Sequence, residues 1–353
     1  MTHGVYIHIP FCKRKCLYCD FPSWANCMED KDAYVRRLIR EIHDRAQNET
    51  VDSIFFGGGT PSVLPAEDLL NILHEVCSSF RVSDDAEITL EANPGTVDLD
   101  KLKELYTGGF NRISFGVQSL CDHELQALGR IHSAKDAEAS ITMAKEAGFL
   151  NINADVMLAI PYQTRDSLEN TLSTLVQLGV SHISAYSLII EEGTPFYEKT
   201  PTLPSEEEER ELYWFAKKYL EEHGFIHYEI SNFAKDGYAS RHNCKYWIRA
   251  PYYGFGVAAH SFLNDHRFAN VSTLDDYIKR NDTISDSIYI PPIEAENERL
   301  MLGFRMLCGV SCDAFDLRIQ KLMKQGLLMM NEDRIKLTDR GLDLANLVFM
   351  EFV

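Results

Sequence analysis

The stretch that says most about the fold of this chain is Tyr6-Ile-His-Ile-Pro-Phe-Cys12-Lys-Arg-Lys-Cys16-Leu-Tyr-Cys19. Residues 5–9 form a short apolar run with the composition of a buried strand, and three cysteines follow it directly. The loop after a parallel strand lies at the carboxyl edge of the sheet, where the functional sites of α/β proteins gather. We therefore expect metal or redox chemistry at this edge.

The three cysteines are separated by three and then two residues. Three thiolates at this spacing can hold one corner of an iron–sulfur cluster and leave one iron open to a substrate. The basic residues 13–15 favour thiolate ionisation and partly offset an anionic cluster. The alternative is a structural zinc site, which needs a fourth ligand from Cys27, His8 or Asp20.

Composition excludes several classes of protein. The 353 residues carry 35 Lys and Arg against 53 Asp and Glu, a formal charge of −18, which disfavours a general nucleic-acid or anionic-lipid binder. Nine cysteines are too few for a disulfide scaffold of this length. No apolar stretch is long enough to cross a bilayer, and residues 1–10 lack a secretory pattern, so we expect a cytoplasmic protein that meets membranes only through a partner.

The pattern to about residue 190 alternates short apolar runs with segments of helical period, which predicts βαβ units around a parallel sheet. Strands are predicted at residues 5–9, 53–56, 87–90, 112–117, 153–158 and 182–188. Helices are predicted at residues 31–46, 66–79, 99–106, 135–147 and 166–178. A sixth is predicted at residues 204–223, where Ser205 and Glu208 have the spacing of a capping box.

The periodicity weakens after residue 225. Residues 225–270 suggest short strands and aromatic-rich loops, residues 294–307 and 313–325 suggest helices, and the end of the chain suggests a small winged-helix-like unit. We therefore divide the chain into residues 1–225, 226–290 and 291–353. Cys308 and Cys312 are expected one turn apart on a helical pattern, packed inside the last part.

Polar or glycine residues end several of the predicted strands. The second strand ends in Gly57-Gly58-Gly59-Thr60-Pro61, where missing side chains would let a ligand approach free backbone N–H groups, although such a run can also be only a tight turn. Glu91, Gln118 and Asp155 lie at the ends of the next three strands. Any one of them can be a satisfied core polar group, but a ring of them implies a site.

Together, the CxxxCxxC loop and the GGGTP segment resemble the radical S-adenosylmethionine (SAM) proteins. The stretches 6–12, 116–118 and 129–132 and the Asp155 context more narrowly resemble the oxygen-independent coproporphyrinogen III dehydrogenase family. This resemblance implies an α/β fold, a partial (β/α)6 barrel with a mainly helical C-terminal domain. It also implies a 4Fe-4S cluster on Cys12, Cys16 and Cys19, and SAM contacts from Tyr6, Tyr18, Gly58, Gly59, Thr60, Glu91, Gln118, Arg130 and Asp155.

Two departures and one motif separate this chain from the dehydrogenase itself. Phe21 stands where that enzyme is expected to carry one more cysteine, and the first strand begins almost at Met1 without a longer extension. Residues 242–247 resemble the HNxxYW heme-binding motif of related radical SAM heme chaperones. That resemblance implies heme as a third cofactor, with His242 or Cys244 as axial ligand and Tyr246 and Trp247 packed on the porphyrin.

The function expected from these resemblances is a heme chaperone that hands heme to apo-hemoproteins, with no catalytic residue assigned and a homodimer as a possible assembly. The alternative is the dehydrogenase, which decarboxylates a porphyrinogen propionate through a 5′-deoxyadenosyl radical. A radical enzyme that modifies RNA is a third class, which the net charge and the lack of a nucleic-acid module disfavour.

Overall fold

A curved parallel sheet forms the centre of the computed structural model, which describes residues 2–353. Six parallel strands are neighbours in chain order: β1 (His3–Ile9), β4 (Thr50–Gly58), β5 (Arg81–Ala92), β6 (Arg112–Gln118), β7 (Asn151–Leu158) and β8 (His182–Ser187). All six coincide with predicted strands. The α/β class and the partial barrel expected from the sequence are therefore confirmed.

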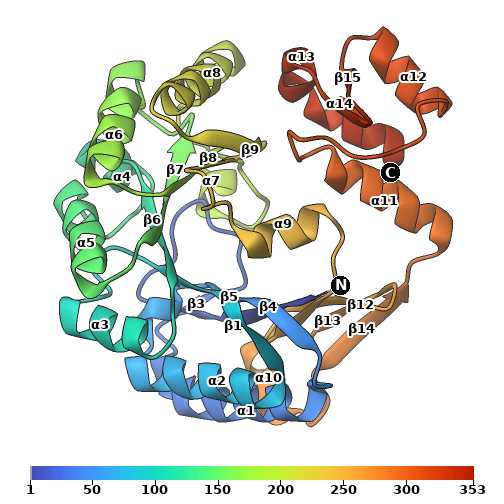
Figure 1. The fold of residues 1–353 in the computed structure, drawn as a ribbon. Helices are drawn as coiled ribbons and strands as arrows, with labels where there is room; N and C mark the ends of the chain where they lie inside the picture. Colours follow the sequence, from blue (N-terminus) through green and yellow to red (C-terminus); the bar gives the residue numbers. More distant parts are fainter. Residues whose placement is uncertain (1) are drawn as a thin grey trace.

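The major helices follow these strands and cover the outer face of the sheet (Figure 1). They are α1 (Lys31–Arg45), α2 (Ala66–Ser79), α3 (Leu99–Thr107), α5 (Ala134–Ala147), α6 (Arg165–Leu178) and α8 (Glu206–Glu222). Capping boxes begin α5, α6 and α8, and Gly148 and Gly179 end α5 and α6 in the left-handed conformation. The sequence missed α4 (Asp122–Ala127) and α7 (Pro195–Glu198), which are too short to show a helical period.

Shorter strands extend the sheet at both ends. Parallel to β1 lies β11 (Tyr252–Phe255), followed by antiparallel β12 (His260–Leu263), β13 (His266–Asn270) and β14 (Ile284–Tyr289). Next to β8 lies β10 (Asn232–Ala234), which pairs with β9 (Ile226–Glu229). Within the described residues the sheet has twelve strands and ends at β14 and β9, so the barrel wall stays open between them.

The curved sheet surrounds the space that holds α9 (Arg241–Trp247), the helix formed by the HNxxYW segment (Figure 1). The prediction of loops here was wrong. Ser240 caps this helix, and the buried Glu87 carboxylate on β5 accepts the backbone N–H of His242 at 3.1 Å. A side chain at Gly4 would meet the Lys245 stem at 3.0 Å, so this glycine leaves room for α9 against β1. This short helix is stabilised by its cap and by burial, and it therefore lacks the periodic apolar pattern by which a longer helix is predicted.

The C-terminal residues form a second, smaller core. It contains α11 (Pro292–Gly303), α12 (Leu317–Lys324), the hairpin of β15 (Leu328–Asn331) and β16 (Arg334–Leu337), α13 (Asp339–Asp343) and α14 (Ala345–Phe349). Its apolar cluster contains no residue of the barrel core. The arrangement of helices around one hairpin agrees with the expected small helical unit, and the division of the chain at residues 225 and 290 remains a prediction.

The segment between α11 and α12 is longer than predicted, because both flanking helices are shorter than the predicted residues 294–307 and 313–325. Helix α11 ends at Gly303, because Met306 then pairs with Glu229 of β9 and Val310 pairs with Ile335 of β16. Cys308 and Cys312 therefore lie in a connecting segment, and the Cys308 side chain is exposed. The expected helix was wrong for both residues and the expected packing was wrong for Cys308, whereas Cys312 does pack against the C-terminal apolar cluster.

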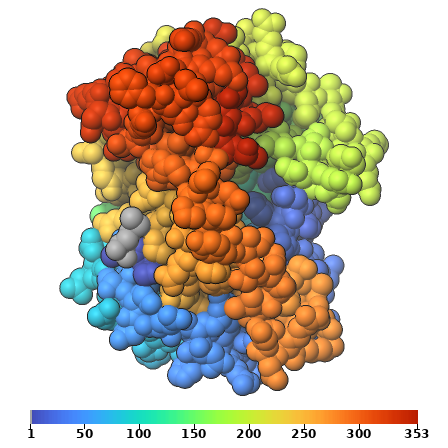
Figure 2. All heavy atoms as spheres, turned by 90° about the vertical axis from the view of Figure 1, so that its right-hand side faces the viewer, coloured from blue at the N-terminus to red at the C-terminus, as the bar shows by residue number. Residues whose placement is uncertain are grey.

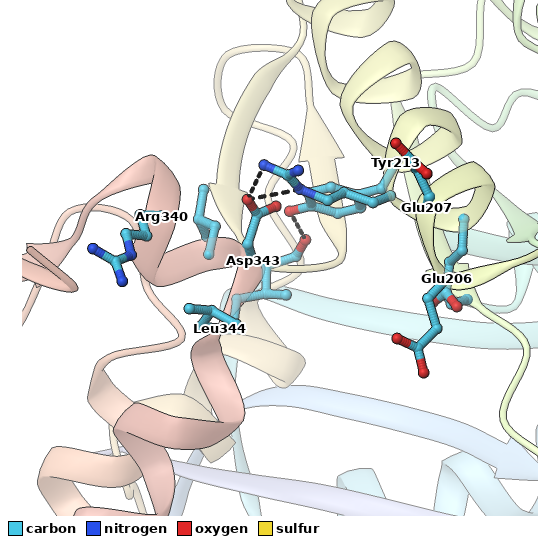
Figure 3. Close-up of a pocket in the computed structure, with 11 residues that line it drawn as sticks. Glu206, Glu207, Tyr213, Arg340, Asp343 and Leu344 are labelled. Carbon is cyan, nitrogen blue, oxygen red and sulfur yellow. Dashed lines mark hydrogen bonds and ion pairs between the residues drawn. The ribbon is translucent and has the colours of Figure 1, made fainter.

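Asp343 joins the C-terminal unit to the barrel helix α8. Its carboxylate accepts a hydrogen bond from the Arg210 guanidinium at 2.6 Å, marked by a dashed line at Asp343 in Figure 3. It also accepts the Trp214 indole N–H at 2.6 Å. Figure 2 shows the C-terminal unit covering one end of the molecule beside the α8 region. Among residues 2–353, no helix is both long and apolar enough to cross a membrane.

Candidate functional site

A cavity of about 390 Å³ lies at the carboxyl edge of the parallel strands, within the usual range for ligand pockets. The three cysteines line one part of it, and residues of α9, β9 and the C-terminal unit line another. Of the residues expected to contact SAM, the lining includes Tyr18, Gly58, Gly59, Thr60, Glu91, Gln118, Arg130 and Asp155. The structure therefore brings together side chains from strands far apart in the sequence.

The cysteine loop begins where β2 (Phe11–Cys12) ends. Cys12 is buried and its Sγ lies 3.5 Å from the Thr60 hydroxyl, while Arg130 places Nη1 3.4 Å from Sγ of Cys16. Burial raises the pKa of Cys19, so a metal or a nearby cation is needed to hold it as a thiolate. The guanidinium of Arg130 and the residues Arg14 and Lys15 in the lining supply that positive charge.

Two of the three residues considered as a fourth zinc ligand have other partners. His8 places Nε2 2.8 Å from the Pro22 carbonyl oxygen, and the Cys27 thiol donates to the Trp24 carbonyl at 3.5 Å. Within residues 2–353 no three His, Cys, Asp or Glu side chains gather around one ion position. In a cubane cluster each thiolate binds a different iron, so the sulfur atoms need not surround one point. The donor set of three thiols in a cation-lined cavity fits such a cluster.

The glycine run has a different role from the one expected. Its N–H groups are not free: Gly58 donates to Glu91 at 3.2 Å, Gly59 to the Ile9 carbonyl at 2.8 Å and Thr60 to the Phe11 carbonyl at 2.9 Å. A Cβ at Gly59 would lie 2.9 Å from the backbone of residues 10 and 11. The run therefore fixes the loop that leads to Cys12, and only its carbonyl oxygens and the Thr60 hydroxyl can accept bonds from a ligand amine.

Arg130 is the most extensively hydrogen-bonded cation of the cavity. Its Nη2 donates to Asn93 Oδ1 at 2.6 Å and to the Gly116 carbonyl at 2.5 Å, and its Nη1 lies 3.4 Å from the Tyr18 hydroxyl. Asn93 in turn donates to the Thr60 hydroxyl at 2.8 Å. These bonds hold the cysteine loop, the glycine run and strand β6 in one arrangement.

Two partly buried carboxyl groups, those of Glu91 and Asp155, face the same cavity. Burial, with the charge of Asp155 nearby, raises the pKa of Glu91 to about 8, and burial also raises the pKa of Asp155. Asp155 accepts the Asn153 amide at 2.8 Å. Both groups are therefore suited to bind a cationic or hydroxyl-bearing ligand, whose hydrogen bonds would compensate for the hydration that the carboxyl groups lose in the cavity.

Tyr6 and Gln118 differ in their access to the cavity. Tyr6 is partly buried with its hydroxyl 3.1 Å from Nδ1 of His8, and it is not among the lining residues. Gln118 lines the cavity and accepts the Tyr186 hydroxyl at 3.3 Å. The structure thus places Tyr6 behind the glycine run, as support for it.

The heme motif is divided between the cavity and the barrel interior. Trp247 lines the cavity, whereas His242 is 1% exposed, with Nδ1 3.0 Å from the Ser53 hydroxyl and Nε2 2.9 Å from the Tyr246 hydroxyl. Burial lowers the pKa of His242 to about 3 and raises that of Cys244 to about 12. His242 is therefore a neutral imidazole with both nitrogens engaged, and heme ligation by it stays a prediction that requires these bonds to open.

Sequence reasoning missed several lining residues: Asn93, Ser184, Tyr186, Glu229, Asn232, Asn243 and Arg305. Asn93 and Tyr186 could have been found, because each lies at the carboxyl end of a predicted strand. Glu229 and Arg305 carry no local signal, since a pairing between β9 and the segment after α11 brings them to the cavity.

Both the sequence and the fold of this chain are similar to those of known proteins. Residues 6–175 match the model of the radical SAM superfamily, and residues 290–344 match the HemN C-terminal domain. The chain is 36% identical to the heme chaperone HemW of Bacillus subtilis over 99% of both proteins, and 34% identical to HemW of Lactococcus lactis over 99% of this chain and 97% of that one. The solved structure of the coproporphyrinogen III oxidase HemN from Escherichia coli superposes with a TM-score of 0.87 at 23% identity, covering 99% of this chain and 90% of that one.

Proposed function

Since this chain belongs to the HemW family of the radical SAM superfamily, we propose that it is a heme chaperone, which binds heme and transfers it to apo-hemoproteins. The observation that carries the proposal is the shared cavity. Trp247 and Asn243 of the HNxxYW helix line the same space as the three cysteines. A ligand bound against α9 would therefore lie next to the cluster and SAM positions.

In this proposal Cys12, Cys16 and Cys19 hold a 4Fe-4S cluster, and Thr60, Glu91 and Asp155 contact SAM. Bound there, the cluster and SAM would supply one-electron chemistry. The residues of the chain have defined tasks around them. Arg130 keeps positive charge beside the Cys16 sulfur, and the Gly58 N–H orients the Glu91 carboxyl group.

Heme binding needs a movement at α9 if His242 is the axial ligand. The imidazole would have to leave the Ser53 and Tyr246 hydroxyls, so its ligation depends on a second arrangement of the helix. Trp247 faces the cavity without that movement and offers a flat apolar surface to a macrocycle.

The experiment that tests the proposal uses the chain reconstituted with iron and sulfide under anaerobic conditions. Heme and coproporphyrinogen III are offered separately, and heme retention, heme transfer to an apo-hemoprotein and vinyl-group formation are measured. We expect retention and transfer of heme and no decarboxylation. Formation of vinyl groups without heme retention would contradict the proposal and would favour the dehydrogenase.

His242→Ala tests the axial ligand, and His123→Ala is its control because His123 is a histidine outside the cavity lining. The heme absorption spectrum should change in the first variant alone, while iron content and SAM binding persist in both. An unchanged heme spectrum in His242→Ala would exclude this histidine as the ligand and direct attention to Cys244.

A further inference from the structure

We propose that Arg305 anchors a carboxylate of the ligand that binds beside Trp247. The inference rests on the proposed function for the identity of this ligand: if the ligand is heme, the carboxylate is one of its propionates. It adds a binding residue from the C-terminal unit, outside both the cysteine loop and the HNxxYW segment.

The backbone around Arg305 is fixed by strand pairing. The Ile230 N–H donates to the Arg305 carbonyl at 3.2 Å, and the Leu307 N–H donates to the Tyr228 carbonyl at 3.0 Å. Residues 305–307 therefore lie alongside β9, joined to it by an isolated antiparallel bridge between Met306 and Glu229. This pairing directs the Arg305 side chain into the wall of the cavity, where its Cζ lies 4.2 Å from the centre of the Trp247 ring.

Stacking on Trp247 holds the guanidinium plane but uses none of its N–H donors. Within residues 2–353, the side chain has one acceptor, Glu229, whose Oε2 lies 3.4 Å from Nη2. Nε of Arg305 and Nε1 of Trp247 are both buried, and neither has an acceptor among the described residues. Buried donors without acceptors are rare and costly, so the unused donors of this pair favour a ligand that brings an acceptor group.

The guanidinium is also accessible and incompletely neutralised. The Arg305 side chain is 25% exposed, whereas Glu229 is fully buried and also accepts the Asn232 amide. Burial raises the pKa of Glu229, which weakens its charge as a partner for Arg305. A planar guanidinium with free donors binds a carboxylate in a two-bond geometry, and a charged partner of that kind satisfies it best.

SAM also carries a carboxylate, so the two sources must be separated. Arg130 already lies beside the cysteines and the glycine run, while Arg305 stacks on the tryptophan of α9. We therefore assign Arg305 to the ligand held against α9. Loss of Arg305 should then leave SAM affinity unchanged.

The test measures binding of heme, heme dimethyl ester and SAM to the reconstituted chain and to Arg305→Gln and Arg305→Lys. The matched control is Arg318→Gln, because Arg318 also stacks on an aromatic ring, Phe352 at 4.7 Å, but does not line the cavity. We expect Arg305→Gln to weaken heme about tenfold or more, Arg305→Lys to weaken it less, and Arg318→Gln to leave it unchanged. The ester, which has no free carboxylate, should bind the wild type more weakly than heme and be insensitive to Arg305.

Iron content and SAM affinity report whether Arg305→Gln keeps its fold, and both should match the wild type. Unchanged heme affinity in that variant, equal affinity of the wild type for heme and its ester, or a selective loss of SAM binding would each overturn the assignment while heme chaperoning stands. Binding of neither heme nor its ester to the wild type would overturn the proposed function and the assignment with it.

Discussion

Nδ1 of His242 lies 3.0 Å from the Ser53 hydroxyl, a contact that joins the HNxxYW helix to the inner face of β4. The same ring stacks on Phe55, with ring centres 5.2 Å apart, and its other nitrogen meets Tyr246. His242 therefore holds α9 inside the barrel in the structure described. Any role in heme ligation has to compete with these contacts.

The buried state of His242 makes its contribution to stability depend on pH. We expect His242→Gln to lower the free energy of unfolding at pH 7.5 by about 1–3 kcal/mol, through lost packing and hydrogen bonds. Burial lowers the folded-state pKa to about 3, against 6.5 in the unfolded chain. Between these values the unfolded chain binds a proton that the folded chain does not, so below pH 6.5 the wild type loses roughly 1.4 kcal/mol per pH unit from this residue.

Because the variant lacks that titration, the difference between the two proteins should shrink as the pH falls. Denaturant unfolding of both at pH 7.5, 6.5 and 5.5 measures it, and the other buried histidines cancel in the comparison. A difference that does not change with pH would mean that the imidazole titrates normally in the folded protein.

Each of the three cysteines should be necessary for iron binding. Replacing Cys12, Cys16 or Cys19 with Ala should reduce the iron of the reconstituted chain from about four per molecule to near zero, because a cubane cluster needs all three thiolates. Cys77→Ala is the control, since that thiol is exposed on α2. Full iron content in any of the three variants would refute the ligand set, and stoichiometric zinc in the wild type would refute the cluster.

Gly59→Ala should impair cluster and SAM binding together, because its Cβ would press on the backbone of residues 10 and 11 beside Cys12. Gly193→Ala is the matched comparison: it has open space around it but a φ of +82°. This control should cost only about 1 kcal/mol of stability and leave iron content intact. Iron content and SAM affinity are measured on both. Loss of SAM binding in Gly59→Ala with normal iron content would instead support direct contact with the ligand.

Glu91 should release a proton when SAM binds. Its pKa of about 8 means that the carboxyl group is largely protonated at pH 7, and a cationic ligand amine beside it favours the ionised form. Calorimetry at pH 7 in buffers of different ionisation enthalpy should show release of up to about one proton for the wild type and none for Glu91→Gln. Equal proton release by both proteins would show that another group titrates.

Asp343 should stabilise the folded chain more through its hydrogen bond with Trp214 than through its ion pair with Arg210. Asp343→Ala leaves the partly buried indole N–H without an acceptor, which should cost about 1–2 kcal/mol of stability. Arg210→Ala should cost less than about 1 kcal/mol, because that side chain is largely exposed. Thermal unfolding of the two variants compares them. A larger loss in Arg210→Ala would show that the ion pair is the main contact.

The sequence by itself determined the parallel strands, the covering helices and the cysteine loop. Apolar period, capping boxes such as Ser205 with Glu208, and cysteine spacing are relations between near neighbours in the chain. Only the tertiary structure decided the rest of the site. It assigned the N–H groups of the glycine run to the loop after β1, enclosed His242 in the barrel, and brought Arg305 onto Trp247. These outcomes depend on strand register and on hydrogen bonds between segments far apart in the chain. Such long-range contacts produce no periodic pattern in the local sequence, so they cannot be predicted from it.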